Sequence, residues 1–284
     1  MRIVNKVDQL KDVIRQLKLA GNTVGFVPTM GYLHEGHLSL MRQAKQEQDI
    51  VVVSIFVNPL QFGPTEDFAV YPRDLARDSA MAESVGVDIV FAPEIEEMYP
   101  NGHSNLLTVV DVSELTEGLC GASRPGHFRG VTTVVNKLFN IVEPDVAYFG
   151  QKDAQQVAVI KQMVNDLNIN VKVVAVPIVR ESDGLALSSR NVFLSKDERQ
   201  AALILSKSLK LASTLLAEGE RNADIIRSAM TKLISDEPLA KIDYIAINDA
   251  VTLADVINIE KPVLIALAVK IGKTRLIDNM VWEG

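Results

Sequence analysis

Up to Pro177, apolar positions alternate between continuous strand-type runs and runs with helical spacing. Runs rich in Val, Ile and Phe predict strands at residues 24–27, 50–57, 88–91, 106–110, 146–149 and 171–176. Apolar residues three and four positions apart predict helices at residues 10–17, 36–44, 74–85, 131–141 and 157–164. Because most of these strands alternate with helices, the pattern predicts an α/β fold with a doubly wound parallel sheet and right-handed crossovers.

The pattern changes after Pro177. The sequence Ser195-Lys196-Asp197-Glu198 has the S-x-x-E form of a capping box, which predicts the start of a long helix through residue 216. A second helix is predicted at 223–234, and strand-like segments follow at 242–247, 262–269 and 275–277. Helices followed by strands that do not alternate with them predict a smaller α+β domain. We therefore expect one domain at residues 1–178 and a second at 179–284.

Residues 24–37 predict a strand that turns directly into a helix. Pro28 lacks a backbone N–H and is expected to stop the strand, while Gly31 and Gly36 allow a tight turn. A strand that turns through glycine into a helix start presents unpaired N–H groups and a positive dipole end, which suits a phosphate. His34 and His37 lie in this turn and are two of the chain's four histidines. They are the first candidates for chemistry.

Two other interpretations of this histidine pair stay open here. The pair could bind a metal ion, although the zinc-protease pattern H-E-x-x-H lies on a continuous helix and Gly36 separates these two histidines. Loop histidines also occur without a functional role. The position of both histidines directly after strand–Pro–Thr–Met–Gly favours the phosphate site.

Composition narrows the class of protein. The 284 residues are 48% hydrophobic and 23% charged, which is ordinary for a globular protein. The formal charge of −7 disfavours a nucleic-acid partner, which would require a basic surface. The single cysteine fits a reducing compartment. The N-terminus is charged too early for a signal peptide, and no run approaches the ~20 apolar residues needed to span a bilayer. We expect a cytoplasmic protein without a membrane partner.

Several loops at the carboxyl ends of the predicted strands carry groups that bind anions, and in doubly wound sheets ligands bind at that edge. The groups are His34, His37, Asn58, Gln61, Lys152 and Asp153, joined by Arg124 from a glycine-rich loop and by Ser188, Ser189 and Arg190 from a polar turn. The chain contains no G-x-x-x-x-G-K-[ST] loop, no G-x-G-x-x-G fingerprint and no G-x-S-x-G elbow. A site of positioning groups and positive charge suits attack on a phosphate.

These motifs resemble those of a known family. His34-Glu35-Gly36-His37 resembles the HIGH motif of the nucleotidylyltransferase superfamily, and Leu187-Ser188-Ser189-Arg190 resembles its degenerate KMSKS loop. The runs Pro28-Thr29-Met30-Gly31, Asn58-Pro59-Leu60-Gln61, Arg124-Pro125-Gly126-His127, Gly150-Gln151-Lys152-Asp153 and Asp278-Asn279 resemble the bacterial pantothenate synthetase family. The motifs follow the family's order over almost the whole chain, and the resemblance implies a Rossmann-like nucleotidylyltransferase domain and a smaller C-terminal lid domain.

The resemblance also implies a reaction. Members join pantoate to β-alanine with ATP and Mg²⁺, through a pantoyl-adenylate intermediate, and release pyrophosphate and AMP. It implies a homodimer. Two rival interpretations stay open: a nucleotidylyltransferase that acts on a different acceptor, and a non-catalytic nucleotide-binding protein. The first would call for a basic pocket where the chain places neutral amides.

The resemblance assigns roles residue by residue. The implied catalytic residues are His34, His37, Lys152 and Arg190. Further ATP contacts are implied for Pro28, Thr29, Met30, Gly31, Gly150, Asp153, Val179, Leu187, Ser188 and Ser189. Pantoate or β-alanine contacts are implied for Met30, Asn58, Gln61, Arg124 and Gln156. Asp153 is a candidate Mg²⁺ ligand, although a helix N-cap is an equal alternative. The family often has glutamate where this chain has Gln151, so only the contact of that side chain is in question.

Overall fold

The computed structural model describes residues 1–64, 66 and 68–284. The chain forms two compact units. The first contains residues 1–150 and 156–177, and the second contains residues 151–155 and 178–284. A short segment from the middle of the chain therefore belongs to the C-terminal unit. Each unit is described by itself below.

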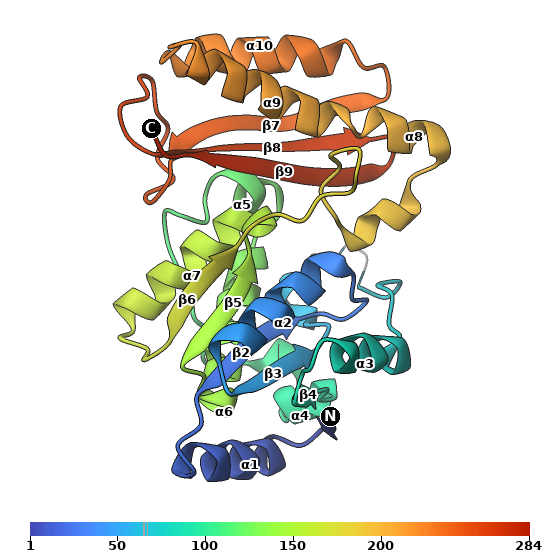
Figure 1. The fold of residues 1–284 in the computed structure, drawn as a ribbon, viewed down its shortest axis with the longest axis vertical. Helices are drawn as coiled ribbons and strands as arrows, with labels where there is room; N and C mark the ends of the chain where they lie inside the picture. Colours follow the sequence, from blue (N-terminus) through green and yellow to red (C-terminus); the bar gives the residue numbers. More distant parts are fainter. Residues whose placement is uncertain (65, 67) are drawn as a thin grey trace. The chain divides into compact units, whose positions relative to one another are not determined.

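Among the described residues, the first unit contains one six-stranded parallel sheet (Figure 1). Its strands are β1 (Arg2–Val4), β2 (Val24–Thr29), β3 (Ile50–Ile55), β4 (Ile89–Phe91), β5 (Val146–Gly150) and β6 (Lys172–Val176). Their order is β1-β4-β3-β2-β5-β6, and every pair is parallel. The chain builds outward from β2 in one direction and from β5 in the other, so the switch point lies between these two strands. This confirms the predicted doubly wound α/β fold.

The helices of this unit are α1 (Val7–Leu19), α2 (Glu35–Glu47), α3 (Leu75–Ser84), α4 (Ile95–Met98), α5 (Leu119–Ser123), α6 (His127–Val142) and α7 (Ala154–Asp166). Short 3-10 turns lie at η1 (Pro59–Gln61), η2 (His103–Asn105) and η3 (Gln151–Asp153). The first two residues of α7 and all of η3 belong to the second unit.

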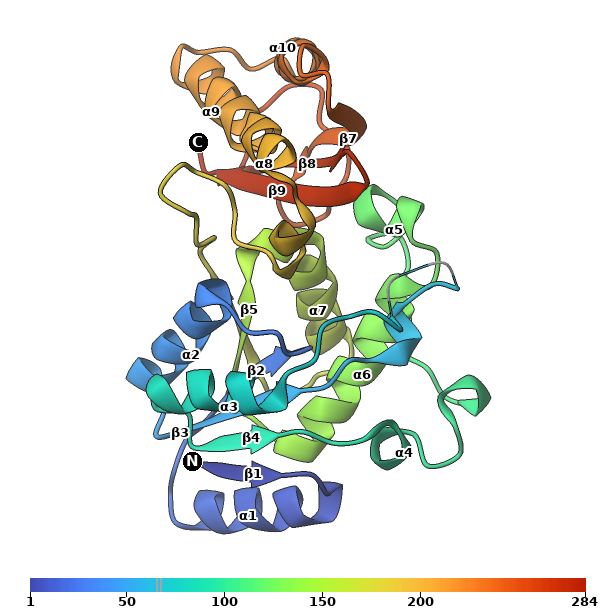
Figure 2. The same cartoon turned by 90° about the vertical axis from the view of Figure 1, so that its right-hand side faces the viewer.

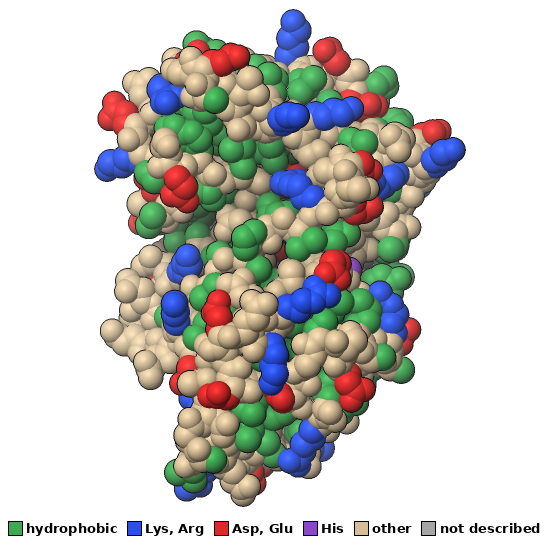
Figure 3. All heavy atoms as spheres, viewed as in Figure 1, with side chains coloured by type: hydrophobic (Ala, Val, Ile, Leu, Met, Phe, Trp, Pro, Cys, Tyr) green, Lys and Arg blue, Asp and Glu red, His purple; other side chains and the backbone are tan. Residues whose placement is uncertain are grey.

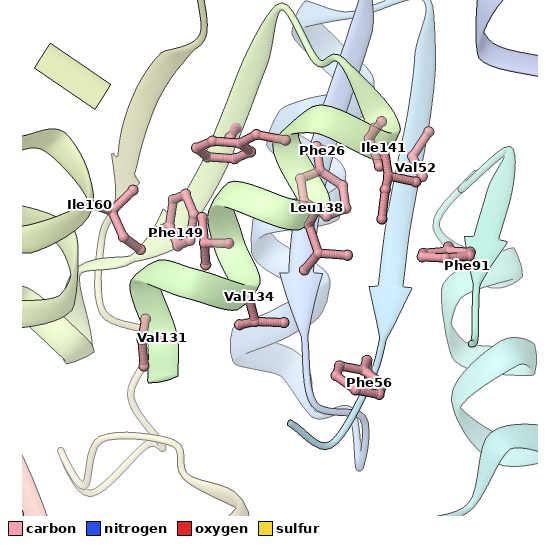
Figure 4. Close-up of a cluster of buried hydrophobic side chains, with 14 of the residues drawn as sticks. Phe26, Val52, Phe56, Phe91, Val131, Val134, Leu138, Ile141, Phe149 and Ile160 are labelled. Atoms are coloured by element: carbon pink, nitrogen blue, oxygen red, sulfur yellow. The ribbon is translucent and has the colours of Figure 1, made fainter. Parts of the chain in front are cut away.

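Successive strand side chains point to opposite faces of the sheet and so form two separate cores. Phe26 and Val52 pack with α1, α6 and α7, and Leu138 and Ile141 of α6 lie beside them (Figure 4). Val27 and Val53 join the core under α2 and α3. Figure 2 shows α2 and α3 on one side of the strands and α6 on the other. Burial on both faces explains why the strands read as nearly continuous apolar runs.

Pro28 does not end its strand as predicted, because β2 continues to Thr29. The carbonyl of Val24 accepts from the β5 side, at Asp145, while the carbonyl of Thr29 accepts from Phe56 on the β3 side. The backbone N–H and C=O groups of even-numbered β2 residues therefore point toward β5. Pairing between β2 and β5 ends at Phe26. Pro28 is even-numbered, so the N–H that it lacks would have pointed toward β5, beyond the last pair with that strand. The hydrogen bonds between β2 and β3 are therefore unaffected and continue to Thr29.

The strand predicted at residues 106–110 is also wrong. The backbone N–H of Val110 donates to Thr133 Oγ1 at 3.0 Å, and its carbonyl accepts from Thr132 Oγ1 at 2.6 Å. Both threonines belong to α6, so this extended segment is held by helix side chains and has no strand partner among the described residues. Leu107 is fully exposed.

In the second unit, a three-stranded antiparallel sheet packs against helices, as predicted for an α+β domain. The strands are β7 (Ala240–Asp249), β8 (Val263–Ile271) and β9 (Thr274–Trp282) in that order, and the helices are α8 (Lys196–Ala201), α9 (Ile204–Ala217) and α10 (Ala223–Ser235). Ser195 and Glu198 form the predicted capping box. The long helix predicted from this box is interrupted at Ala202 and Leu203, where tighter i-to-i+3 backbone bonds replace the α-helical pattern.

Within the described part of the chain, no helix combines the length and apolarity that crossing a membrane requires. Lysine and arginine side chains intermingle with aspartate and glutamate side chains on the face shown in Figure 3. That face carries no large field of one sign.

Two neighbouring isoleucines in α10 differ in their burial in the core of the second unit. Ile226 is fully buried among core residues, whereas Ile225 is 51% exposed. We expect Ile226→Ala to lower the free energy of unfolding of this unit by about 2–5 kcal/mol, because it leaves a cavity. Ile225→Ala should change it by less than about 0.5 kcal/mol. Urea unfolding followed by the fluorescence of Trp282, the chain's single tryptophan, measures both. Equal losses for the two variants would contradict the packing described.

Candidate active site

The turn between β2 and α2 is held by its own side chains. Thr29 Oγ1 donates to the carbonyl of Ser54 at 2.8 Å and accepts from the N–H of Gly31 at 3.1 Å. Gly31 has a φ of +80°, and a Cβ there would lie 2.9 Å from Asp78 Oδ2 and 3.0 Å from a methyl of Ile55. The residue must therefore be glycine, both for its backbone and for the space around it. The hydroxyl of Thr29 therefore makes structural hydrogen bonds, one of them to the backbone of the turn.

Asp78 of α3 binds the next two residues of this turn. Its carboxylate, 1% exposed, accepts from the N–H groups of Tyr32 at 2.6 Å and Leu33 at 2.8 Å. Arg77 lies against the same carboxylate at 3.2 Å and donates to the carbonyl of Leu33 at 2.8 Å. Tyr32 has a φ of +48°, an unfavourable conformation for a residue with a side chain. Two charge-assisted bonds offset that cost.

His34 and His37 close the N-terminus of α2 as a capping box made of imidazoles. His34 Nδ1 accepts from the N–H of Gly36 at 3.1 Å, and His37 Nδ1 accepts from the N–H of His34 at 3.3 Å. The ring centroids are 4.1 Å apart. The spacing of three residues thus has a structural reason, because the N-cap and N3 side chains satisfy backbone donors that the helix leaves open.

The capping bonds also assign the tautomer of both rings. An Nδ1 that accepts a hydrogen bond from a backbone N–H carries no proton, so in the neutral ring the proton is on Nε2. The proton of each neutral imidazole therefore lies on Nε2, on the side away from its cap. Two adjacent neutral donors at a helix N-terminus suit anionic oxygens.

The loop after β3 forms a buried polar network. Asn58 accepts from the hydroxyl of Tyr99 at 2.7 Å and donates to Gln61 Oε1 at 3.2 Å and to the carbonyl of Gly130 at 3.1 Å. The Nε2 of Gln61 lies 3.1 Å from Met30 Sδ. The structure therefore brings together Met30, Asn58 and Gln61, which the sequence assigned to one pocket. Tyr99 had no signal in the sequence.

Gly130 lets α6 approach this loop closely. A Cβ on Gly130 would overlap the carbonyl oxygen of Leu60 and lie 2.7 Å from the N of Gln61. These are backbone atoms, which have little freedom to move away. The glycine therefore sets the distance between α6 and the loop at residues 58–61, which we call the pocket loop.

Arg124 is already paired. Its guanidinium donates to both carboxylate oxygens of Glu66, at 2.8 and 2.6 Å, and to the carbonyl of Gln61 at 3.3 Å. His127 lies between the guanidinium and the same carbonyl. The hydrogen bond from Arg124 holds the pKa of Glu66 below its usual range. A substrate carboxylate at Arg124 would have to replace Glu66, and the role expected for this arginine stays a prediction.

In the second unit, Lys152 and Asp153 lie in η3, which is tied to β9. Asn279 Nδ2 donates to the carbonyls of Gln151 and Lys152, each at 2.9 Å, and Gln151 Nε2 donates to Asn279 Oδ1 at 3.4 Å. Gln151 therefore has a structural contact of its own. Lys152 Nζ is 3.9 Å from Asp153 Oδ1, whose side chain is half exposed.

The polar turn predicted at residues 187–191 is a short 3-10 helix, η4 (Ser189–Phe193), with Ser188 as its cap. Ser188 Oγ accepts from the N–H of Arg190 at 3.2 Å, and the N–H of Leu187 donates to the carbonyl of Val179 at 3.0 Å. Arg180 braces the start of this segment through both oxygens of the buried Asp278, at 2.6 and 2.8 Å.

Gln156 is partly exposed in the first turn of α7, and Gly150 ends β5. Among the described residues, no group of three or more His, Cys, Asp or Glu side chains is arranged to hold a metal ion.

Asp78 gives the sharpest test of this geometry. Asp78→Asn keeps the shape but turns an amide NH₂ toward one of the two backbone donors. We expect it to cost about 1–3 kcal/mol of stability in the turn. Hydrogen exchange of the Tyr32 and Leu33 amides should accelerate by roughly fivefold or more, because about 1.4 kcal/mol corresponds to a factor of ten.

Asp74→Asn is the matched control in the same helix. Asp74 accepts from the N–H of Arg77 as the N-cap of α3, and asparagine caps equally well. Exchange of the same two amides should stay at its wild-type rate in this variant. Unchanged exchange in Asp78→Asn would rule out the role given to its carboxylate.

Comparison with known proteins places the chain in a family. The pantoate-beta-alanine ligase family model matches residues 2–281. A pantothenate synthetase of Heliobacterium modesticaldum is 63% identical over 283 residues and covers 100% of both chains. One from Acetivibrio thermocellus is 59% identical, also over 100% of both.

Solved structures agree with the sequence matches. The pantothenate synthetase of Thermus thermophilus superposes with a TM-score of 0.93 at 46% identity, over 99% of both chains. A pantoate-beta-alanine ligase of Francisella tularensis, solved with beta-gamma ATP and beta-alanine, gives a TM-score of 0.79 at 37% identity, over 99% of this chain and 97% of that one. With the site motifs and the doubly wound sheet described above, these matches show that the chain belongs to the pantoate–β-alanine ligase family.

Proposed function

We propose that this chain condenses pantoate with β-alanine at the expense of ATP, giving pantothenate, AMP and pyrophosphate through pantoyl adenylate. The observation that carries the proposal is the family match over residues 2–281. The imidazole pair supports it, because its two neutral Nε2–H donors suit a reaction on a phosphate.

In the first step, a carboxylate oxygen of pantoate attacks the α-phosphorus of ATP. A new P–O bond forms while the bond to pyrophosphate breaks. His34 and His37 would donate from Nε2 to phosphate oxygens as negative charge builds on them. Lys152 and Arg190 would neutralise the departing pyrophosphate, lysine as a point charge and arginine through its planar fork. Ser188 and Ser189 would add donors from their turn.

In the second step, the neutral amine of β-alanine attacks the acyl carbon of the adenylate. The C–N bond forms, AMP leaves with the bonding electrons, and the nitrogen loses a proton. Nothing in this step requires a covalent intermediate on the protein. The contribution of the chain is to hold the amine and the acyl carbon in line, which by itself lowers the barrier.

Further contacts follow the same assignment. ATP would also contact Pro28, Thr29, Met30, Gly31, Gly150, Asp153, Val179 and Leu187, and pantoate or β-alanine would contact Met30, Asn58, Gln61, Arg124 and Gln156. Residues 1–178 would form the domain that binds ATP and pantoate, and residues 179–284 the lid. Lys152 belongs to the second compact unit, together with Arg190.

Mg²⁺ is proposed as a companion of the ATP phosphates. The residues fit a weakly held ion of this kind, because Asp153 offers one half-exposed carboxylate and Mg²⁺ usually binds through one or two carboxylates plus phosphates. When bound, the ion would neutralise phosphate charge. We further propose a homodimer in the cytoplasm, and the single cysteine is consistent with a reducing compartment.

Product release tests the reaction directly. Pyrophosphate release should require ATP and pantoate, and AMP release should require β-alanine as well. Another nucleotidylyltransferase would release pyrophosphate with a different acceptor and ignore pantoate. A non-catalytic nucleotide-binding protein would bind ATP and release neither product, so either outcome would reject the proposal.

His37→Ala should slow pantoate-dependent pyrophosphate release at least tenfold, because it removes one phosphate donor. His103→Ala, on an exposed turn, is the matched control and should keep the wild-type rate.

His37→Gln separates chemistry from capping. Glutamine at the third helical position can close a capping box, so this variant should melt near the wild-type temperature. Its rate should stay low, because the amide does not place a donor where imidazole Nε2 lies. A wild-type rate in His37→Ala would refute the role of this histidine.

A further inference from the structure

We propose that Tyr99 is a positioning residue that acts through Asn58 to fix the direction of the Gln61 side-chain amide, so that Gln61 presents an N–H donor to the acid substrate. This inference rests on the function proposed above and deepens it. It gives a role to a buried tyrosine that is distant in sequence from both amides. Hydrogen bonds connect backbone groups and Tyr99 to Asn58, and Asn58 to Gln61.

The direction of the Asn58 amide is set by backbone groups that can act in only one way. A carbonyl only accepts, so the Gly130 oxygen at 3.1 Å requires the nitrogen Nδ2 beside it. A backbone N–H only donates, so the Leu60 N at 3.4 Å requires the oxygen Oδ1. Asn58 is 1% exposed, and water cannot replace these partners. These two backbone bonds define the direction of the amide, and both are longer than the 2.7 Å bond from Tyr99.

Tyr99 supplies the short bond to the same oxygen. Its hydroxyl lies 2.7 Å from Asn58 Oδ1, compared with 3.4 Å for the Leu60 N–H. Burial raises the pKa of Tyr99, so the hydroxyl keeps its proton and donates. The ring is 2% exposed, and the Phe56 ring lies 6.1 Å away. The donor is therefore held in place by packing.

Asn58 in turn orients Gln61. The second proton on Asn58 Nδ2 points to Gln61 Oε1 at 3.2 Å, so the oxygen end of the Gln61 amide is occupied. The nitrogen end faces Met30 Sδ at 3.1 Å. A thioether is a weak acceptor, so a better acceptor from a ligand can take the Gln61 N–H from it. Gln61 is 9% exposed, so a misdirected amide would have few other partners.

The fixed direction selects the chemistry of the ligand at this point. A carboxylate or a hydroxyl oxygen can accept from Gln61 Nε2, whereas an ammonium group has only donors. Pantoate offers both kinds of acceptor. The ammonium form of β-alanine offers none at its amine end. The network thus directs the hydroxy acid, and not the amine group, to Gln61.

Steady-state kinetics of Tyr99→Phe test the inference on the whole chain. Removing the hydroxyl leaves Asn58 Oδ1 with only the 3.4 Å bond from Leu60, so the Asn58 and Gln61 amides are held less firmly and the oriented fraction falls. We expect KM for pantoate to rise at least fivefold, with KM for ATP unchanged within twofold.

Tyr148→Phe is the matched control. Tyr148 is fully buried in β5, and its hydroxyl donates to Glu47 at 2.8 Å, away from the amide network. This variant loses one buried tyrosine bond but should keep both KM values. A similar rise in pantoate KM in both variants would show a general structural effect and overturn the inference.

A double-mutant cycle identifies the route. If Tyr99 acts through Gln61, then Tyr99→Phe should raise pantoate KM in the wild-type background and have no further effect in Gln61→Ala. The same fold-change in both backgrounds would overturn the inference. Failure of the wild-type chain to form pantothenate would instead reject the proposed function.

An NMR measurement on the unmodified chain covers the case in which Tyr99→Phe does not fold. The side-chain NH₂ signals of Gln61 should shift on addition of pantoate, which offers a carboxylate and hydroxyl oxygens as acceptors. Shifts with β-alanine and none with pantoate would overturn the inference.

Discussion

The carboxylate of Asp78 satisfies the backbone N–H groups of the turn between β2 and α2. That turn places Tyr32 at a positive φ and points two N–H groups into a buried space. Without an acceptor those donors would be unsatisfied, which would destabilise the backbone conformation between β2 and the start of α2. The cap formed by His34 and His37 begins directly after it. The turn that this buried acid of α3 holds leads directly into the start of α2, where both imidazoles lie.

Sequence periodicity predicts the architecture well because burial on both faces leaves a plain signal in each strand. The runs at Val51–Val53 and Ala147–Phe149 are typical of strands that are covered on both faces of a parallel sheet. The histidine pair is equally visible, since its cap is local and spans four residues. Asp78 and Tyr99 gave no such signal. Each acts on residues about forty or more positions away, and only the folded chain shows which N–H or amide lies opposite.

Pro28 and Lys152 show two further limits of sequence reasoning. Pro28 ends a strand only if its missing N–H faces a neighbouring strand, and that depends on how far β5 extends. Lys152 follows β5 and would be assigned with it by order along the chain. The side chain of Asn279 instead binds the carbonyls around it and joins this segment to β9. The side chain of one asparagine near the end of the sequence thus joins the segment of a candidate cation to the second unit.

The polar groups of the two units differ in kind, and this difference bears on selectivity. The first unit presents neutral donors: two imidazoles and an amide whose directions follow from backbone groups. Arg124, which donates to the backbone of the pocket loop, already pairs with Glu66. Lys152 and Arg190 belong to the second unit. Neutral donors fixed in direction discriminate by geometry, because a ligand atom without a lone pair leaves a buried N–H unsatisfied, at a cost of about 1–3 kcal/mol. Cations attract any anion. In the proposed reaction, the directed amide would therefore recognise the acid, while the imidazoles, Lys152 and Arg190 would stabilise phosphate charge.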